Sequence, residues 1–308
     1  GAFAVITSLT ISRVAGNMDR KTLLLLLTAI MAMSGVIVAL AQNYMVYMIG
    51  RALLGVVIGG FWSMSVAMAM RLVPPSDVPR AMAIFNSGNA LAMVIAAPLG
   101  SYLGSIIGWR GAFFCLVPVA IVTFIWQWIS LPSMQIDTDQ TDKHPTILGL
   151  LRNPIVMIGM LAVSLFFMGQ FSLYTYVRPF LETITQVDIS TLSLILLGIG
   201  VMGFIGTCII NIFLDRRFYT TLIMSPILMA IIALTLIFFG TSTIVVAILL
   251  GIWGLLGTGL PVGWWRWLAQ TLPEDAEAGG GLMVAVVQLA IALGSTLGGI
   301  LLDHSGFQ

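Results

Sequence analysis

The stretch that decides the fold is GRALLGVVIGGFW, residues 50–62. It lies near the start of an apolar run that continues to Arg71, and a run of that length is typical of a membrane-spanning helix. On such a helix Arg51 shares one face with Gly55 and Gly59, because these residues follow one another at four-residue intervals. The face carries one charge and little side-chain bulk, which favours the close approach of a neighbouring helix.

Arg51 has two interpretations. A cation at bilayer depth is costly and usually has a functional reason. Alternatively, Arg51 stands only a few residues from the start of the helix and extends its side chain to the lipid headgroups. The glycine face beneath it favours the first interpretation, because such a face points into a helix bundle rather than into lipid.

The composition restricts the class of protein. The chain is 59% hydrophobic and 8% charged, whereas a soluble domain carries about 25% charged residues. It is therefore predicted to be an all-α polytopic membrane protein. The formal net charge of +1 gives no reason to expect a nucleic-acid partner. Cys115 and Cys208 lie in apolar runs, and the two histidines are far apart, so we expect no disulfide framework, metal site or cofactor.

The hydrophobic segments define the predicted organisation. Ten of them are typical of membrane helices: 1–15, 22–41, 44–70, 80–104, 110–131, 154–181, 189–214, 219–239, 243–270 and 279–303. A polar linker, 132–153, separates an amino-terminal bundle, 1–131, from a carboxy-terminal bundle, 154–308. When the loops are assigned alternately to the two sides, ten of the 13 basic residues fall on the side that holds the linker. That side is predicted to be cytoplasmic.

The two halves repeat one another. DRK at 19–21 corresponds to DRR at 215–217, an offset of 196 residues, and LGSYLG at 99–104 corresponds to LGSTLG at 293–298, an offset of 194. A repeat of this size predicts a transporter with two pseudosymmetric six-helix bundles. The repeat places one further helix before residue 1 and one after the last segment. We therefore expect helices 2–11 of a twelve-helix design.

Several motifs resemble those of the major facilitator superfamily, and within it the drug:proton antiporter branch. GRxxxGxxxGG at 50–60 resembles the branch's fourth-helix motif, and Ala97-Pro98-Leu99-Gly100 resembles its fifth-helix antiporter motif, with alanine in place of the usual glycine. GWRxxF at 108–113 matches the following loop. The cytoplasmic loop motif is only partly present as NMDRK at 17–21, without its usual glycine.

A closer similarity is to the bacterial purine ribonucleoside efflux pumps. It is carried by motifs that span much of the chain: GGFWxMS at 59–65, MRLVPP at 70–75, GQF at 169–171, TYxRP at 175–179 and PVGW at 261–264.

The resemblance implies a secondary transporter, not an enzyme. It would export a small solute, with purine ribonucleosides favoured, by proton antiport across a bacterial inner membrane, and act as a monomer in the lipid bilayer. Export of sugars or antibiotics by the same fold is one alternative, and a truncated, non-transporting membrane protein is another. The residues to which the resemblance assigns helix packing and gating are Gly55, Gly59, Pro98, Gly100, Gly104, Asp19 and Arg20.

Proton coupling requires a titratable group. The predicted spans hold acidic residues only near their ends, at Glu182, Asp215 and Asp303. Arg51 does not release a proton under ordinary conditions, so it can act only on the pKa of a partner or bind an anion. The resemblance implies that the coupling carboxylate lies in the helix before residue 1, facing Arg51. Solute exchange without a buried acid is the alternative.

Polar residues in the spans are candidates for the substrate cavity. Gln170 and Tyr174 lie one turn apart and could line a cavity that binds a sugar or a base. The alternative is an interfacial anchor, with Tyr176 and Arg178 at the level of the lipid headgroups. Arg178 could pair with Glu182 four residues later. The other cavity candidates are Asn89, Gln288 and Trp62, the last of which could stack on a purine or simply pack.

Three tryptophans close to the cytoplasmic end of the 243–270 segment are too closely spaced to share one face. We expect at least one of Trp264, Trp265 and Trp267 to lie in the interfacial aromatic belt or to face lipid.

Overall fold

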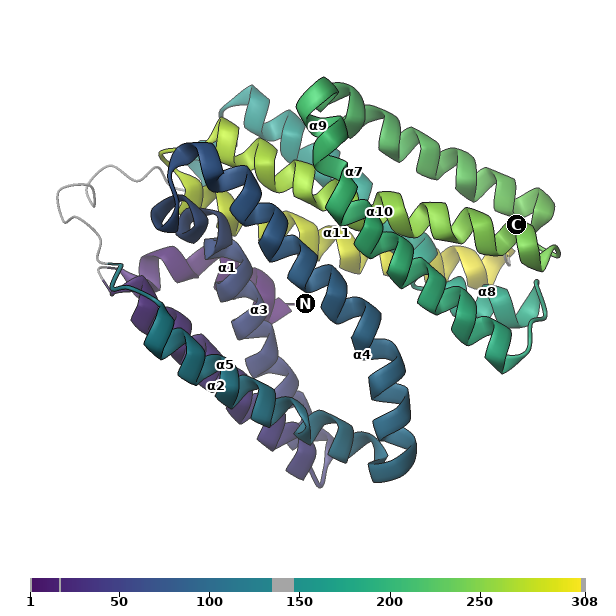
Figure 1. Cartoon of the computed structure of the whole chain (residues 1–308), viewed down its shortest axis with the longest axis horizontal. Helices are drawn as coiled ribbons and strands as arrows, with labels where there is room; N and C mark the ends of the chain where they lie inside the picture. The colour runs from purple at the N-terminus through teal and green to yellow at the C-terminus, as the bar shows by residue number, and fades with distance from the viewer. Residues whose placement is uncertain (1, 17, 135–146, 306–308) are drawn as a thin grey trace. The chain divides into compact units, whose positions relative to one another are not determined.

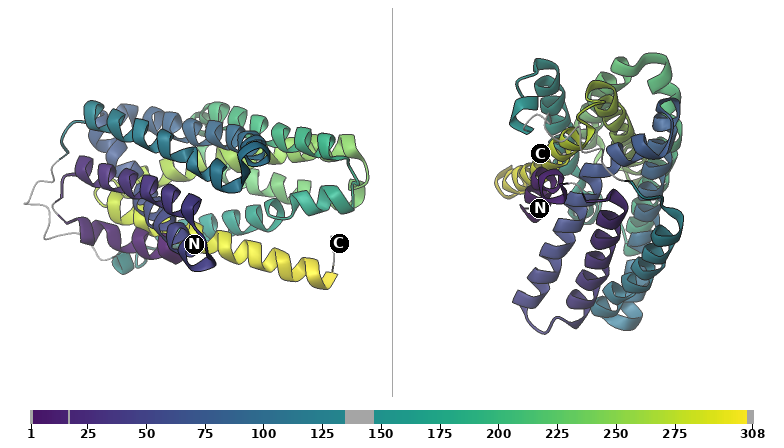
Figure 2. Two further views of the ribbon diagram at one scale, coloured as in Figure 1. Left: turned by 90° about the horizontal axis from the view of Figure 1, so that it is seen from below. Right: turned by 90° about the vertical axis from the view of Figure 1, so that its left-hand side faces the viewer.

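The structure is a computed structural model that describes residues 2–16, 18–134 and 147–305, apart from a few side chains that include those of Arg13 and Pro98. Every element in these ranges is helical (Figure 1, Figure 2). In chain order they are α1 (Ala2–Ala15), α2 (Arg20–Leu40), α3 (Tyr44–Leu72), η1 (Pro75–Asp77), α4 (Val78–Phe114), α5 (Leu116–Ser130), α6 (Ile147–Leu150), α7 (Pro154–Tyr174), α8 (Val177–Thr183), α9 (Ile189–Phe239), α10 (Thr243–Thr271) and α11 (Ala276–Ser305).

The prediction of an all-α membrane fold is confirmed. Seven helical stretches in the described ranges are long and apolar enough to cross a membrane. The predicted number of ten is approximate, since some segments join. α9 has 51 residues, about 77 Å of helix, which exceeds twice the thickness of the hydrocarbon core. The chain reverses direction at Arg217, where φ is −148° and ψ is 73°, so α9 contains both predicted segments of that region (Figure 1).

By its internal contacts the chain forms two compact units. Unit 1 comprises residues 1–75, 99–160 and 271–289, and unit 2 comprises residues 76–98, 161–270 and 290–308. α4, α7 and α11 are therefore each divided between the two units. The division into bundles 1–131 and 154–308 follows the sequence repeat instead, and it stays a prediction. Most of the linker between them, residues 135–146, lies outside the described residues.

The core of unit 1 lies where α1, α2 and α3 meet the segment that follows α5. Its buried side chains are Ile11, Ala15, Leu23, Leu24, Leu27, Met64, Met68 and Met134. On another face of α2, the hydroxyl of Thr28 donates to Oε1 of Gln127 on α5 at 2.9 Å. This bond satisfies a buried polar group where α2 and α5 pack together.

The glycine face of α3 packs against α1. A Cβ placed on Gly55 would lie 3.1 Å from Cβ of Phe3, and one placed on Gly59 would overlap the backbone carbonyl of Ala4. Because that obstacle is backbone, no rotamer change can relieve it. Without a hydrophobic driving force between helices in lipid, such close approach supplies the packing energy.

Unit 2 uses the same device where α7 meets α11. A Cβ on Gly294 would overlap the carbonyl of Met168, and one on Gly298 would lie 2.7 Å from the carbonyl oxygen of Ser172. The phenol of Tyr176 donates to the carbonyl of Ser295 at 2.7 Å. Backbone contacts of this kind hold α7 against α11.

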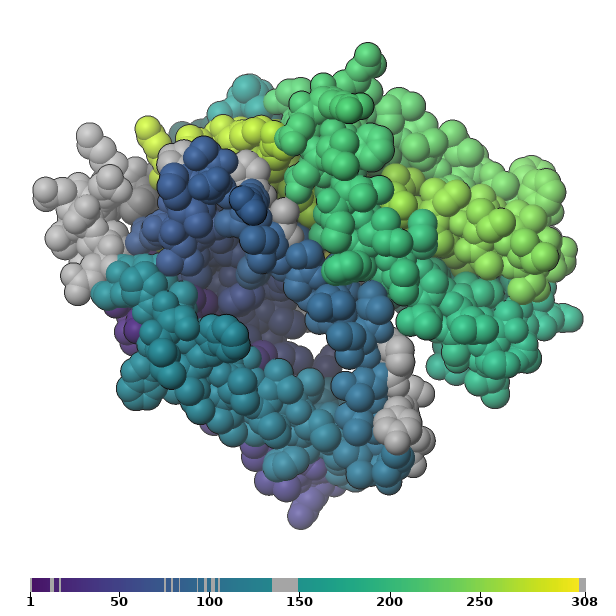
Figure 3. Space-filling model, viewed as in Figure 1, coloured from purple at the N-terminus to yellow at the C-terminus, as the bar shows by residue number. Residues whose placement is uncertain are grey.

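Large apolar side chains cover the outward faces. On α5 Trp126 is 70% exposed and Ile129 is 78% exposed. On the second arm of α9, the part that follows Arg217, Phe238 is 80% exposed. Figure 3 shows α5, in teal, at the surface of unit 1. Exposed apolar surface on this scale is typical of helices that face lipid.

We expect Gly59→Ala to destabilise the protein by about 1–3 kcal/mol, because the added methyl group overlaps backbone. Gly104→Ala is the matched control in the same unit. A Cβ there meets no described atom within 4 Å, so the change should be neutral or stabilising by up to about 1 kcal/mol. Thermal unfolding of both variants in detergent measures the difference. Equal melting temperatures would contradict the close contact.

Candidate functional site

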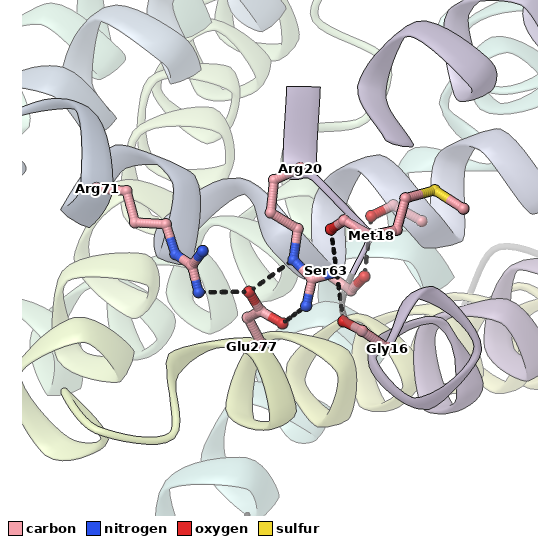
Figure 4. A network of polar contacts seen from close by, with 7 residues as sticks. Gly16, Met18, Arg20, Ser63, Arg71 and Glu277 are labelled. Atoms are coloured by element: carbon pink, nitrogen blue, oxygen red, sulfur yellow. Dashed lines mark hydrogen bonds and ion pairs between the residues drawn. The ribbon is translucent and has the colours of Figure 1, made fainter. Parts of the chain in front are cut away.

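A charged cluster forms at one end of unit 1, around Arg20 in the first turn of α2. The Arg20 side chain is 2% exposed. Its Nε donates to Oε1 of Glu277 at 3.0 Å and its Nη2 donates to Oε2 at 2.5 Å, in a bidentate pair (Figure 4). Such a fork is the strongest geometry available to an arginine and a carboxylate. An arginine buried to this degree requires a partner of this kind.

Glu277 binds a second arginine as well. Nη2 of Arg71, in the last turn of α3, donates to Oε1 of Glu277 at 3.2 Å. Glu277 lies in the first turn of α11, where the helix dipole favours a negative charge. One carboxylate therefore serves two guanidinium groups, and the cluster keeps a net positive charge.

The helix that carries Glu277 lies against backbone on its next turn. A Cβ on Gly280 would overlap the carbonyl of Ser63 on α3, and one on Gly281 would overlap the carbonyl of Ser8 on α1. These glycines allow α11 to approach closely enough for Glu277 to reach Arg20. The ion pair and the glycine contacts thus form a single junction of α1, α2, α3 and α11.

Asp19 caps α2 beside this junction. Its carboxylate accepts hydrogen bonds from the Ser133 hydroxyl at 2.6 Å, from the Met134 amide at 2.8 Å and from the Lys21 amide at 2.9 Å. The hydrogen bond from Ser133, helped by the backbone amides, holds the pKa of Asp19 below its ordinary value despite some desolvation. Asp19 therefore fastens the start of the linker to the amino terminus of α2.

Asp19 and Arg20 were predicted from the sequence, whereas Glu277 was not. The predicted start of the last helix was residue 279, which left Glu277 in a loop. The cost of burying a charge could have pointed to Glu277, because an arginine that is buried between helices needs a carboxylate partner. No local pattern shows which carboxylate that is.

The predicted cavity residues divide between the units. In unit 1 Arg51 is exposed, and it has no hydrogen-bond or ion-pair partner among the described residues. Trp62 is half-buried and packs edge-on against Phe61, with ring centroids 6.4 Å apart. Gln288 is half-buried on α11. The structure does not bring these three side chains into one described pocket.

In unit 2 Gln170 is the most constrained candidate. Its Nε2 donates to the carbonyl of Gly257 on α10 at 3.0 Å, while its buried Oε1 has no partner among the described residues. Tyr174, one turn later, is 40% exposed and meets Phe171 edge-on at 6.0 Å. Asn89 is exposed on α4. Gln170 thus holds a buried, oriented hydrogen-bond acceptor whose capacity no described residue satisfies.

Other predicted residues have varied outcomes. The pairing of Arg178 with Glu182 is confirmed, at 2.8 Å. A Cβ on Gly100 or Gly104 would meet no described atom within 4 Å, so the packing role of these glycines stays a prediction. The side chain of Pro98 lies outside the described residues.

The expectation of a lipid-facing tryptophan on α10 is wrong. Trp264, Trp265 and Trp267 are 7%, 8% and 4% exposed. All three side chains are therefore buried. Their spacing suggested that not all of them could be buried, but this part of α10 is buried around most of its circumference.

The model of the Major Facilitator Superfamily matches residues 1–295. The transcription regulatory protein OpdE of Pseudomonas aeruginosa is 65% identical over 310 residues, which cover 100% of this chain and 77% of that protein. The purine ribonucleoside efflux pump NepI of Salmonella paratyphi B is 38% identical over 303 residues, which cover 98% of this chain and 76% of that protein.

Two solved structures have the same fold. The human organic anion transporter MFSD10 superposes with a TM-score of 0.77 at 18% identity, covering 100% of this chain and 78% of that one. The Escherichia coli fucose:proton symporter FucP superposes with a TM-score of 0.78 at 15% identity, covering 99% and 83%. At these identities the likeness concerns the fold alone.

We expect Glu277→Gln to lower the free energy of unfolding by about 3 kcal/mol, because it leaves the buried Arg20 guanidinium without a counter-charge. Glu182→Gln is the control. It removes a carboxylate from an exposed arginine pair, where such pairs contribute about 0.3–0.5 kcal/mol. Thermal unfolding in detergent tests both variants, and similar losses would contradict the special role of Glu277.

The Asp19 contacts should depend on pH. Because the folded pKa is lowered, their stabilisation is fully present above the ordinary pKa of about 4 and is lost as the pH falls through the lowered value. Asp19→Ala should show the same loss at neutral pH. We expect hydrogen exchange at the Met134 amide to accelerate about fivefold, in line with the loss of a helix cap. Asp303→Ala is the control, and unchanged exchange in Asp19→Ala would contradict the role of Asp19 in holding Met134.

Proposed function

Since this chain belongs to the major facilitator superfamily of transporters, we propose that it exports purine ribonucleosides in exchange for protons across a bacterial inner membrane. The choice of solute is supported by 38% identity to NepI over 98% of the chain, and by the motifs shared with such pumps. In the proposed orientation the linker 132–153 and the Arg20 cluster are cytoplasmic, because ten of the 13 basic residues fall on that side.

The observation that carries the mechanism is the Arg20–Glu277–Arg71 cluster. α2 and α3 belong to the first repeat of the sequence, whereas α11 belongs to the second, so the ion pairs join the repeats at one end. Alternating access needs contacts that form in one state and separate in the other. We propose that the cluster closes the cytoplasmic gate.

The chemistry of the cluster suits such a gate. A buried ion pair has little net stability, since the desolvation of both charges offsets their attraction. When the two helix ends separate together, both charges regain water, so opening is cheap. When only one partner is removed, the other stays buried and unpaired, which is expensive. The pair therefore enforces correct closure without opposing opening.

Gln170 and Tyr174 are proposed to bind the solute. Oε1 of Gln170 is an acceptor held in place by the bond from Nε2 to Gly257. A ribose hydroxyl or a purine amino group could donate to it. The ring of Tyr174, one turn away, offers an aromatic face for the base. Asn89, Gln288 and Trp62 remain proposed cavity residues.

Arg51 is proposed to act in proton coupling. Its guanidinium keeps its charge throughout, so it can only favour the ionised form of a neighbouring carboxylate. It is exposed, and no described carboxylate pairs with it. The solute would bind either in competition with the proton for that carboxylate or after the proton has left it.

The proposal can be tested with the full-length protein in inverted membrane vesicles, where an internal pH-sensitive dye reports the proton gradient. We expect inosine to discharge the proton gradient, and arabinose and chloramphenicol to leave it unchanged. Arg51→Gln should reduce the inosine response at least tenfold, because it removes the charge that favours the carboxylate, while Arg51→Lys should retain part of it. Arg178→Gln, on an exposed arginine, is the control.

Each other outcome corrects a different part of the proposal. A response to arabinose or chloramphenicol alone would replace the nucleoside with a sugar or an antibiotic. An unchanged response in Arg51→Gln would remove Arg51 from coupling. No response to any solute would favour a regulatory, non-transporting protein, the second candidate, which the 65% identity to OpdE brings into consideration.

A further inference from the structure

A pocket lies in unit 1, where the connection between α2 and α3 meets the end of α4. Its volume is about 430 Å³. Gln42, Tyr44, Tyr47, Trp109 and Arg110 are among the residues that line it. None of these residues belongs to the gate or to the proposed solute site. In the orientation proposed from the basic residues, this pocket lies on the side opposite the Arg20 cluster.

A glycine builds the pocket. Gly108 interrupts α4 with φ of 74° and ψ of 167°, a conformation that is essentially restricted to glycine. The two residues that follow it turn toward the α2–α3 connection. Nε and Nη2 of Arg110 donate to the carbonyl of Ala41 at 3.2 and 2.8 Å, which fixes the guanidinium at the end of α2.

The guanidinium is also held by aromatic rings. Cζ of Arg110 lies 4.5 Å from the centroid of the Trp109 ring, in a cation–π contact. Tyr47 in turn meets Trp109 edge-on, with ring centroids 6.0 Å apart. The cation therefore has a defined position before any ligand arrives, which lowers the entropic cost of binding.

The charge of Arg110 is not neutralised. The residues that line the pocket include no aspartate or glutamate, and the single described acceptor for Arg110 is an uncharged carbonyl. Nη1 makes no hydrogen bond to any described residue. A planar guanidinium with free N–H groups is well suited to a phosphate.

The surroundings of the pocket are apolar. Ile106 and Ile107, which precede Gly108 in the chain, are 61% and 48% exposed. Leu116 and Val119, which follow on α5, are 56% and 60% exposed. Tyrosine and tryptophan beside such a surface are typical of the membrane–water interface. A ligand that combines a phosphate with hydrocarbon chains would satisfy both parts at once, whereas a free phosphate would leave the apolar border unused.

We propose that this pocket binds the phosphate of an anionic phospholipid from the outer leaflet. The headgroup phosphate pairs with Arg110, and the acyl chains lie along the exposed side chains of α4 and α5. Bound there, the lipid ties the α2–α3 connection to the kinked end of α4. This site is independent of the proposed solute and of proton coupling.

Native mass spectrometry of the complete protein with phosphatidylglycerol tests the proposal. We expect Gln42→Glu to weaken phosphatidylglycerol binding roughly tenfold, because it places a carboxylate in the pocket while leaving the Arg110 clamp intact. Gln186→Glu makes the same change at an exposed residue of unit 2 and should leave binding unchanged. The obvious variant, Arg110→Gln, also breaks the clamp to Ala41, so Gln42→Glu is the decisive one.

Two further arms identify the ligand. Phosphatidylcholine, whose headgroup carries a compensating cation, should bind roughly tenfold more weakly than phosphatidylglycerol. Inorganic phosphate at millimolar concentration should not displace the lipid. Equal binding of phosphatidylglycerol to Gln42→Glu and to the unaltered protein would overturn the proposal, and displacement by inorganic phosphate would replace the lipid with a free anion.

Discussion

The buried guanidinium of Arg20 is the constraint on which the rest of unit 1 depends. A charge that is 2% exposed must be matched almost completely, and Glu277 matches it with two hydrogen bonds. That match requires α11 to start close to α2, which the contacts at Gly280 and Gly281 permit. It also requires a fixed first turn of α2, which the Asp19 cap supplies. Electrostatics, glycine packing and capping thus act together.

Helix packing in both units follows from the properties of lipid as a solvent. Apolar side chains gain little by leaving lipid for a helix interface, so association depends on close contact and on hydrogen bonds between helices. Gly59 on α3 and Gly294 on α11 bring their helices against a carbonyl of a neighbour. The large apolar side chains, in contrast, point outward on α5 and on the second arm of α9.

Three arginines show how environment determines the role of one residue type. Arg20 is buried and fully paired, which suits a gate. Arg110 is clamped to a carbonyl and stacked on Trp109 but lacks a counter-charge, which suits an anion site. Arg51 is exposed without a described partner, which suits a charge that acts on another group. Composition alone assigns all three the same cost of insertion into a membrane.

The sequence by itself determined the membrane class, most helix boundaries and the family, because hydrophobic length and short motifs are local properties. It also predicted the Arg178–Glu182 pair, which lies within one helical turn. Only the tertiary structure decided that Glu277 pairs with Arg20, 257 positions earlier, and that three tryptophans of α10 are all buried. It likewise separated Gly59, which meets backbone, from Gly104, which meets no described atom. These differences depend on which helices are neighbours, and no local pattern of residues contains that information.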